Sequence, residues 1–356
     1  MSLQKNAEAL DAIVFAEKIL ALLDQGAFTS TYKFAVLLGL MDLVVEQADS
    51  SGTLASVITT RQLAEKIIDV YWAHTVAYSP LNAVPKQNTR GQAEIISKVE
   101  CFREKSQFST LFKAKRENNK GYKTLLDNVE KKLIEMPLPR LQYFGQQEQR
   151  FIYDIAWDKS IADNLKNVTA YQRQQLSDFD NRIHLVPQVA DYLVVLNGLL
   201  RPLIQRTWAL QVARINKLKE SKLEAFLFQN KRAAIAQFSE GLSDIQANQC
   251  FYCEKPLGKS QKTKPEVDHF VPWSRYPNDG LANLVVAHSA CNLSKSDHVA
   301  AFDYYQHWQE RNSDQDSLSV IDEMAVAFQW EVRLIESLNI AQTLYGRLGG
   351  GVELWG

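Results

Sequence analysis

Four side chains that commonly bind metals form two pairs in the C-terminal half of the chain. The pairs are Cys250 with Cys253 and His288 with Cys291, and two residues separate the members of each pair. This spacing lets one tight turn present both side chains to one ion, and zinc prefers thiolate and imidazole ligands in a tetrahedron. Two correctly spaced pairs are hard to obtain from unrelated buried cysteines and a chance histidine. Four protein ligands leave no open position, so we predict a structural Zn²⁺ site whose binding energy contributes to folding.

A second group of polar residues lies among these ligands. Asp268 and His269 are adjacent, and Asn283 and Asn292 follow them along the chain. Hydrolysis of a phosphodiester needs an activated water and a cation that offsets the developing negative charge. A histidine accepts a proton near neutral pH, and carboxylate and amide oxygens suit hard cations such as Mg²⁺. The residue types therefore favour metal-assisted phosphodiester hydrolysis.

The stretch from Cys250 to Lys295 closely resembles the Cys-flanked form of the HNH endonuclease family. It is also similar to the HNH domain of RNA-guided CRISPR nucleases. The resemblance covers about fifty of the 356 residues. The motifs that carry it are Asp268-His269-Phe270-Val271-Pro272, Asn283-Leu284 and Cys291-Asn292-x-x-Lys295.

The resemblance implies a ββα-metal fold, which is a β-hairpin followed by a short helix. It implies that His269 is the general base for the attacking water and that Asn283 braces the loop carrying this histidine. It further implies that Asp268 and Asn292 bind a catalytic Mg²⁺ or Mn²⁺, and that the products carry a 5′-phosphate and a 3′-hydroxyl. Asn292 stands where the eponymous pattern has a final histidine, which leaves the metal preference open.

Taken singly, these residues also have ordinary alternatives. Adjacent Asp268 and His269 would suit a surface turn, and Asn292 would suit a helix cap. On a strand, Asp268 and His269 would point to opposite faces, so we expect a bend or bulge that aims both at one phosphate. Lys295 is either a phosphate contact or a solvated helix residue.

Composition places the protein among ordinary globular chains. It has 356 residues, 46% of them hydrophobic, and a formal net charge of −1, which gives no global signal for nucleic-acid binding. We expect one large or two to three modest domains. We expect no membrane span and no signal peptide, because the required apolar runs are absent from the sequence. Thiolates reserved for a metal suit a reducing compartment, so we expect a cytoplasmic protein.

The hydrophobic periodicity predicts a mainly α fold, a multi-helix scaffold that carries the small HNH domain. We divide the chain into an N-terminal α-helical domain (1–136), a middle segment with short strands and then long basic helices (137–245), the HNH domain (246–300), and a C-terminal helical segment with a docked tail (301–356). The predicted helices lie at about 7–25, 32–46, 59–68, 92–109, 121–134, 186–218, 225–246, 300–310 and 318–337, and the predicted strands near 141–144 and 150–157. We expect Pro202 to kink the helix 186–218 or to start a new one.

The most basic segment of the chain runs into the nuclease motif. Residues 201–236 hold eight Lys and Arg against two Glu. Neutralising phosphates drives association with DNA, so this segment is our first candidate for a DNA-backbone contact, with a solvated helix face as the alternative. A shorter basic run over residues 113–123 has the same two interpretations.

The sequence thus predicts a metal-dependent HNH endonuclease acting on DNA. By analogy with the family, its setting would be bacterial restriction or anti-phage defence. Two alternatives stay open: a nuclease for RNA or single strands, and a catalytically silent zinc-knot module that binds nucleic acid or protein. A single site cuts one strand at a time, which makes a homodimer or a partner subunit plausible.

Overall fold

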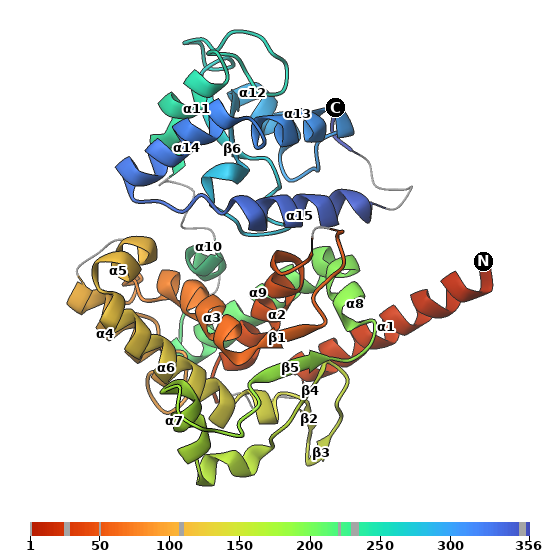
Figure 1. Cartoon of the computed structure of the whole chain (residues 1–356), viewed down its shortest axis with the longest axis vertical. Helices are drawn as coiled ribbons and strands as arrows, with labels where there is room; N and C mark the ends of the chain where they lie inside the picture. Colours follow the sequence, from red (N-terminus) through yellow and green to blue (C-terminus); the bar gives the residue numbers. More distant parts are fainter. Residues whose placement is uncertain are drawn as a thin grey trace. The chain divides into compact units, whose positions relative to one another are not determined.

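The chain folds into two compact units in a computed structural model (Figure 1). Unit 1 comprises residues 1–44 and 54–229, and unit 2 comprises residues 45–53 and 230–356. The structure describes residues 2–24, 29–49, 51–106, 110–219, 222–228, 235–348 and 354–356. The fold is mainly α-helical, as predicted. Residues on both sides of position 136, where we placed a domain boundary, lie in unit 1.

Unit 1 is built mostly of helices. They are α1 (Ser2–Asp24), α2 (Tyr32–Glu46), α3 (Thr60–His74), α4 (Glu94–Ser106), α5 (Leu111–Glu117), α6 (Asn119–Glu135), α7 (Lys166–Gln172), α8 (Val189–Val195), α9 (Asn197–Asn216) and α10 (Leu223–Phe228), with the short 3-10 helices η1 (Leu138–Arg140) and η2 (Lys159–Asp163). The start of α3 shows why such a helix forms where it does. Thr59 accepts from the Gln62 backbone N–H, and the Gln62 side chain accepts in return from the Thr59 N–H. This reciprocal cap satisfies backbone N–H groups at the start of α3 and explains why the helix begins directly after Thr59.

Two small antiparallel sheets complete unit 1. One has the strand order β1 (Val57–Thr59), β5 (Arg182–Leu185) and β4 (Tyr153–Ile155). The other pairs β2 (Tyr143–Phe144) with β3 (Gln147–Glu148). The strands predicted near 141–144 and 150–157 are therefore present, although each is shorter than its prediction.

Two helix predictions for the middle of the chain were wrong in extent. The helix predicted over 186–218 is divided at Leu196 into α8 and α9, and α9 continues through Pro202. A proline removes one backbone donor from a helix, and the remaining hydrogen bonds of α9 carry it past this point. The helix predicted over 225–246 corresponds to α10, η4 (Ile235–Phe238) and α11 (Ser239–Ile245), and residues 229–234 lie outside the described part of the chain.

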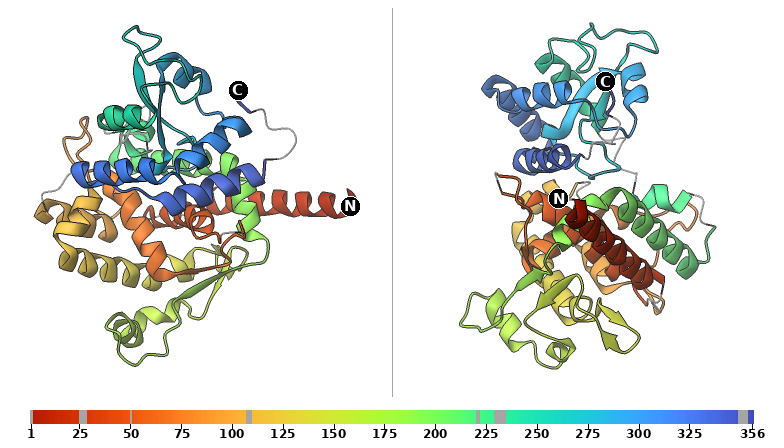
Figure 2. Two further views of the ribbon diagram at one scale, coloured as in Figure 1. Left: turned by 45° about the horizontal axis from the view of Figure 1, so that its top comes forward. Right: turned by 90° about the vertical axis from the view of Figure 1, so that its right-hand side faces the viewer.

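Unit 2 contains a β-hairpin followed by a short helix, as the resemblance implied. The strands β6 (Pro265–His269) and β7 (Leu284–His288) are antiparallel, and α12 (Ser289–Lys295) follows β7 directly. The unit also contains η5 (Leu281–Asn283), α13 (Phe302–Arg311), α14 (Gln315–Phe328) and α15 (Leu334–Gly346). Figure 2 shows the hairpin within this unit, with helices around it.

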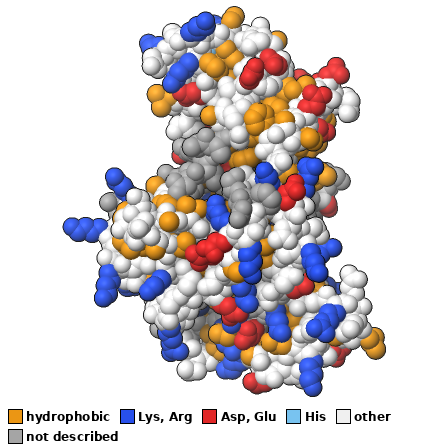
Figure 3. Space-filling model, turned by 90° about the vertical axis from the view of Figure 1, so that its left-hand side faces the viewer, with side chains coloured by type: hydrophobic (Ala, Val, Ile, Leu, Met, Phe, Trp, Pro, Cys, Tyr) orange, Lys and Arg blue, Asp and Glu red, His pale blue; other side chains and the backbone are white. Residues whose placement is uncertain are grey.

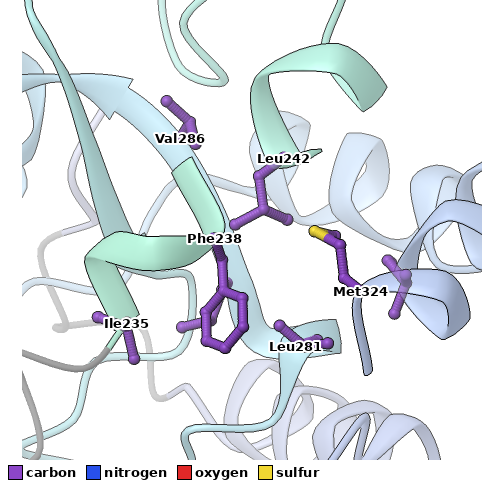
Figure 4. Close-up of a cluster of buried hydrophobic side chains, with 8 residues drawn as sticks. Ile235, Phe238, Leu242, Leu281, Val286 and Met324 are labelled. Atoms are coloured by element: carbon purple, nitrogen blue, oxygen red, sulfur yellow. The ribbon is translucent and has the colours of Figure 1, made fainter. Parts of the chain in front are cut away.

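A buried apolar cluster ties the hairpin to the helices of unit 2. Side chains from η4, α11, η5, β7 and α14 meet in it (Figure 4). Its members are Ile235, Phe238, Leu242, Leu281, Leu284, Val286, Ile321 and Met324. Each fully buried side chain of this kind contributes about 1.5–3 kcal/mol, so the cluster fixes β7, and with it the residues at both of its ends.

The helix predicted over 318–337 is in fact two helices. The backbone turns left-handed at Gln329 and at Arg333, with φ of 52° and 50°, which ends α14 and precedes α15. The intervening residues 330–333, called the strap below, pair instead with η5. The backbone N–H groups of Leu281 and Ala282 each donate to strap carbonyls at 3.1 Å. Periodicity alone does not reveal this break, because its cause is the hydrogen bonding of a distant segment.

The last residues of the chain pack onto unit 2. The Trp355 N–H donates to the Val299 carbonyl at 2.9 Å, and Ala301 N–H donates to the Trp355 carbonyl at 2.7 Å. The indole N–H of Trp355 donates to Ser294 Oγ at 3.0 Å. None of the helices in the described part of the chain combines the length and hydropathy that a membrane crossing requires.

Candidate active site and metal centre

The structure brings the four predicted zinc ligands together. The ligand atoms of Cys250, Cys253, His288 and Cys291 all lie within 4.8 Å of one another. His288 ends β7 and Cys291 lies in α12, while the two other cysteines come from the turn before β6. Within the described residues, this is the only set of three or more His, Cys, Asp or Glu side chains close enough to hold one metal ion.

The orientation of His288 suits a metal ligand. Its Nδ1 lies 3.2 Å from Cys253 Sγ and 3.9 Å from Cys291 Sγ. Its Nε2 lies 3.0 Å from the Pro256 carbonyl oxygen. A carbonyl can only accept, so Nε2 carries the proton and Nδ1 directs its lone pair at the sulfurs. A backbone carbonyl commonly fixes a ligating histidine in this way.

The pKa values of two of the thiols shift in opposite directions. Burial raises the pKa of Cys253, but hydrogen bonds from the Lys255 backbone and from the neighbouring ligand side chains lower it overall. Burial, and then the neighbouring Cys250, raise the pKa of Cys291 to about 12. A bound divalent cation would stabilise the thiolate forms of the cysteines, because its charge offsets both their burial and their mutual repulsion. The donor set of three sulfurs and one imidazole nitrogen matches a structural zinc site.

Asp268 and His269 end strand β6 and face different neighbours. The pairing with β7 is one-to-one, with Asp268 opposite Val285 and His269 opposite Leu284. The one-to-one register excludes the bulge that we expected within β6, and the chain instead bends at Phe270, directly after His269. Each residue of β6 pairs with a residue of the buried strand β7, and this continuous pairing accommodates no extra residue.

Asp268 is held through one of its two carboxylate oxygens. Its Oδ2 accepts from Tyr252 OH at 2.5 Å and from Lys295 Nζ at 2.9 Å. Burial, and then the Asp268 charge, raise the pKa of Tyr252 well above its ordinary value, so the phenol stays protonated and donates. Because both bonds use Oδ2, the Oδ1 atom is left to act as an oxygen ligand.

Lys295 lies inside unit 2. Its side chain is fully buried, and its ammonium also donates to the His269 carbonyl at 3.0 Å. The alternative of a solvated helix residue was therefore wrong. The physical reason is the buried carboxylate of Asp268, which requires a counter-charge. A phosphate contact by Lys295 would have to be made by an ammonium that already has these two partners.

His269 is oriented by a carboxylate outside the sequence motif. Its Nε2 lies 2.9 Å from Asp279 Oδ1, and its ring lies beside Trp273, with the ring centroids 5.3 Å apart. The remaining ring nitrogen, Nδ1, has no hydrogen bond among the described residues. It is the atom of this histidine that can accept a proton.

Asn283 ties the chain after His269 to the loop that precedes β7. Its Oδ1 accepts from the Val271 N–H at 2.9 Å, and its Nδ2 donates to the carbonyls of Val271 and Asn278 at 3.2 and 3.0 Å. The side chain is fully buried. These bonds tie the residues that follow His269 to the loop before β7.

Asn292 contacts an acidic residue, Glu266, that the sequence analysis did not place at the site. Its Nδ2 donates to Glu266 Oε2 at 3.2 Å, which directs the amide oxygen elsewhere and leaves it available as a ligand. The spacing of Glu266 and Asp268 on one strand could have revealed this neighbour, because alternate residues share a face. No such signal pointed to Tyr252 or Asp279, whose roles depend on turns.

The expected DNA-binding segment is only partly exposed. Arg201 is buried and ion-paired with Asp42, because it serves the core of unit 1. Lys231 and Arg232 lie outside the described residues. The exposed basic side chains of this segment are Arg206, Arg214, Lys217, Lys219 and Lys222. On the face of unit 1 shown in Figure 3, Lys and Arg side chains are interspersed with Asp and Glu and form no single basic patch.

Two family models match the sequence. A model described as HNH endonuclease matches residues 250–301, and a model described as a domain of unknown function (DUF8808) matches residues 14–228. The first span contains the metal centre and the residues around His269, and the second lies almost entirely in unit 1. No curated protein and no solved structure matches the chain.

Proposed function

The chain belongs to the DUF8808 family and carries an HNH endonuclease domain, and from this premise we propose that it hydrolyses phosphodiester bonds of DNA with a divalent cation. One observation carries the proposal. A metal centre of three cysteines and a histidine supports a ββα unit in which His269 keeps one ring nitrogen for a proton, while Asp268 and Asn292 each keep one side-chain oxygen for a cation.

In the proposed reaction His269 accepts a proton from the attacking water at Nδ1. Asp268 and Asn292 supply a carboxylate and an amide oxygen, a donor set that fits Mg²⁺ or Mn²⁺. The bound cation would neutralise the charge that develops on the phosphate. Asn283 holds the residues that directly follow the base. By resemblance to the family, the products carry a 5′-phosphate and a 3′-hydroxyl.

We propose that the exposed basic side chains after Arg201 contact the DNA backbone, since phosphate neutralisation drives such association. The setting that we propose is bacterial restriction or anti-phage defence, on the analogy of other HNH domains carried by helical scaffolds. The reducing cytoplasm would keep the three metal-binding thiols available.

The first test is cleavage of supercoiled plasmid by the full chain in Mg²⁺ or Mn²⁺. We expect nicked circles, and we expect EDTA to abolish them. His269→Ala should lower the rate by about 10²–10⁴-fold, the usual contribution of a general base, without loss of zinc. His184→Ala is the matched control, because this histidine is exposed on β5 and should not affect cleavage.

The other outcomes separate the alternatives. Cleavage of RNA or of single strands, but not of duplex DNA, would replace the substrate and keep the site. No cleavage by a folded protein that contains zinc would favour a silent binding module. A single site cuts one strand per visit, so linear DNA should appear after nicked DNA, and a homodimer would make this second step depend on protein concentration.

A further inference from the structure

His269 has a partner whose geometry sets the state of its ring. Nε2 of His269 lies 2.9 Å from Asp279 Oδ1, and the exposed fractions of the two side chains are only 6% and 12%. An ionised carboxylate can only accept a hydrogen bond, so the proton between the two atoms belongs to Nε2. The neutral imidazole then has its lone pair on Nδ1.

The backbone around Asp279 is fixed on both sides. Its carbonyl accepts from Trp330 Nε1 of the strap at 2.7 Å. The carbonyl of Asn278 accepts from Asn283 Nδ2 at 3.0 Å, and Asn278 Oδ1 accepts from the Gly280 N–H at 2.9 Å. Hydrogen bonds therefore fix the backbone that carries the Asp279 carboxylate. A functional group needs such support to be held in one precise orientation.

The second oxygen of this carboxylate has no such partner. Asp279 Oδ2 is buried and makes no hydrogen bond with any described residue. A buried polar atom without a partner costs about 1–3 kcal/mol, and functional sites are one place where proteins retain this cost. The negative charge beside His269 stabilises a positive imidazolium more than a neutral imidazole, and so favours the state that forms during proton transfer.

From these observations we propose that Asp279 is a positioning residue for His269. Its carboxylate holds the imidazole in the tautomer that carries a proton on Nε2, so that Nδ1 faces the attacking water. This inference rests on the proposed nuclease function. Asp279 lies outside the sequence motif, in the loop between β6 and β7, and the path of this loop places its carboxylate beside His269.

The water proton moves to Nδ1 of His269, and the water oxygen forms a bond to phosphorus. The bond between phosphorus and O3′ breaks, and the O3′ oxyanion takes a proton from solvent. Asp279 stays ionised and keeps its hydrogen bond to Nε2 throughout, so it gains an ion-pair partner only while His269 is protonated.

Asp279→Asn tests the proposal in the full chain. The amide has nearly the same shape, but it can donate an N–H to Nε2 and thereby favour the tautomer with the proton on Nδ1. We expect kcat for plasmid nicking to fall by roughly 10- to 100-fold, the scale found for partners that orient a functional histidine, with KM unchanged. Asp322→Asn, at an exposed position of α14, is the matched control and should keep the wild-type rate.

A second readout does not depend on activity. Selective ¹⁵N labelling of histidine, at a pH where the imidazole is neutral, reports which ring nitrogen carries the proton, and His269→Ala identifies the signal. We expect Nε2–H in the wild type and a shift toward Nδ1–H in Asp279→Asn. A wild-type ring protonated on Nδ1 would overturn the proposal, and so would an Asp279→Asn protein with unchanged kcat and unchanged tautomer.

The two proposals can fail separately. If the wild type cuts no nucleic acid, the proposed function fails, while the wild-type spectrum still decides the orientation of His269. Zinc content and the unfolding midpoint show whether Asp279→Asn folds. If it does not fold, the wild-type tautomer decides: a proton on Nε2 supports the positioning role, and a proton on Nδ1 rejects it.

Discussion

At the scale of single residues, Lys295 connects the two residues on which the proposed chemistry depends. Its ammonium donates to Asp268 Oδ2 and to the His269 carbonyl, and it lies 5.8 Å from the centroid of the Tyr252 ring. The lysine side chain is fully buried. A buried ion pair adds little net stability over an apolar pair, but the loss of one partner leaves an uncompensated charge.

We therefore predict that Lys295→Met destabilises unit 2 by about 3–5 kcal/mol, the usual cost of breaking a buried pair from one side. Adding Asp268→Asn to this variant should recover much of the loss, because no charge then remains unpaired. Urea unfolding measures both effects, and Lys259→Met, at an exposed position, is the control. A stable Lys295→Met protein that merely binds DNA more weakly would instead identify this lysine as a phosphate contact.

The residues of the site differ in how far a sequence can predict them. The four zinc ligands were predictable because short spacing within two turns largely determines where these side chains meet. Asp268, His269 and Asn283 followed from a motif with a fixed order. Asp279 did not, because its contact with His269 depends on a loop whose path is set by the strap.

At the scale of elements, close packing of the strap against the loop before β7 depends on one glycine. A Cβ on Gly280 would lie 2.5 Å from Arg333 Cβ and 2.6 Å from the Val332 carbonyl oxygen. Neither atom is the far end of a flexible side chain, so the backbone itself would have to move. The strap also holds the carbonyl of Asp279 through Trp330.

Gly280→Ala should therefore destabilise unit 2 by about 1–3 kcal/mol, the usual cost of overpacking, and should also slow plasmid nicking because Asp279 is displaced. Denaturant unfolding and the nicking rate measure the two effects. Gly346→Ala is the matched control, since a Cβ at the end of α15 would meet nothing within 4 Å. A Gly280→Ala protein of wild-type stability would show that the strap can move without cost.

The elements themselves were predicted best where local sequence alone determines them. The cap at Thr59 and the apolar run of α2 are local signals. α2 has its predicted range, and α3 begins within one residue of its prediction but continues to His74. The break between α14 and α15 is different. It arises from hydrogen bonds between η5 and the strap, so tertiary contacts override a helical pattern that continues through residues 318–337.

At the scale of the whole molecule, the metal centre belongs to only one of the two units. All four ligands lie in unit 2, close to the apolar cluster that holds β7. Unit 1 has its own buried residues, including the Arg201–Asp42 pair. Binding of zinc to the folded state adds to the stability of the unit that contains the site, and need not change the other.

We accordingly predict two transitions in calorimetric unfolding of the full chain, because separate cores need not melt together. A zinc chelator, or Cys253→Ser, should lower the midpoint of one transition and leave the other in place. Cys101→Ser is the matched control, since this cysteine is exposed on α4 in unit 1 and should change neither the zinc content nor the melting. About one zinc per chain is expected in the wild type. If the chelator shifts both transitions equally, or if wild-type protein contains no zinc, the metal does not have this local structural role.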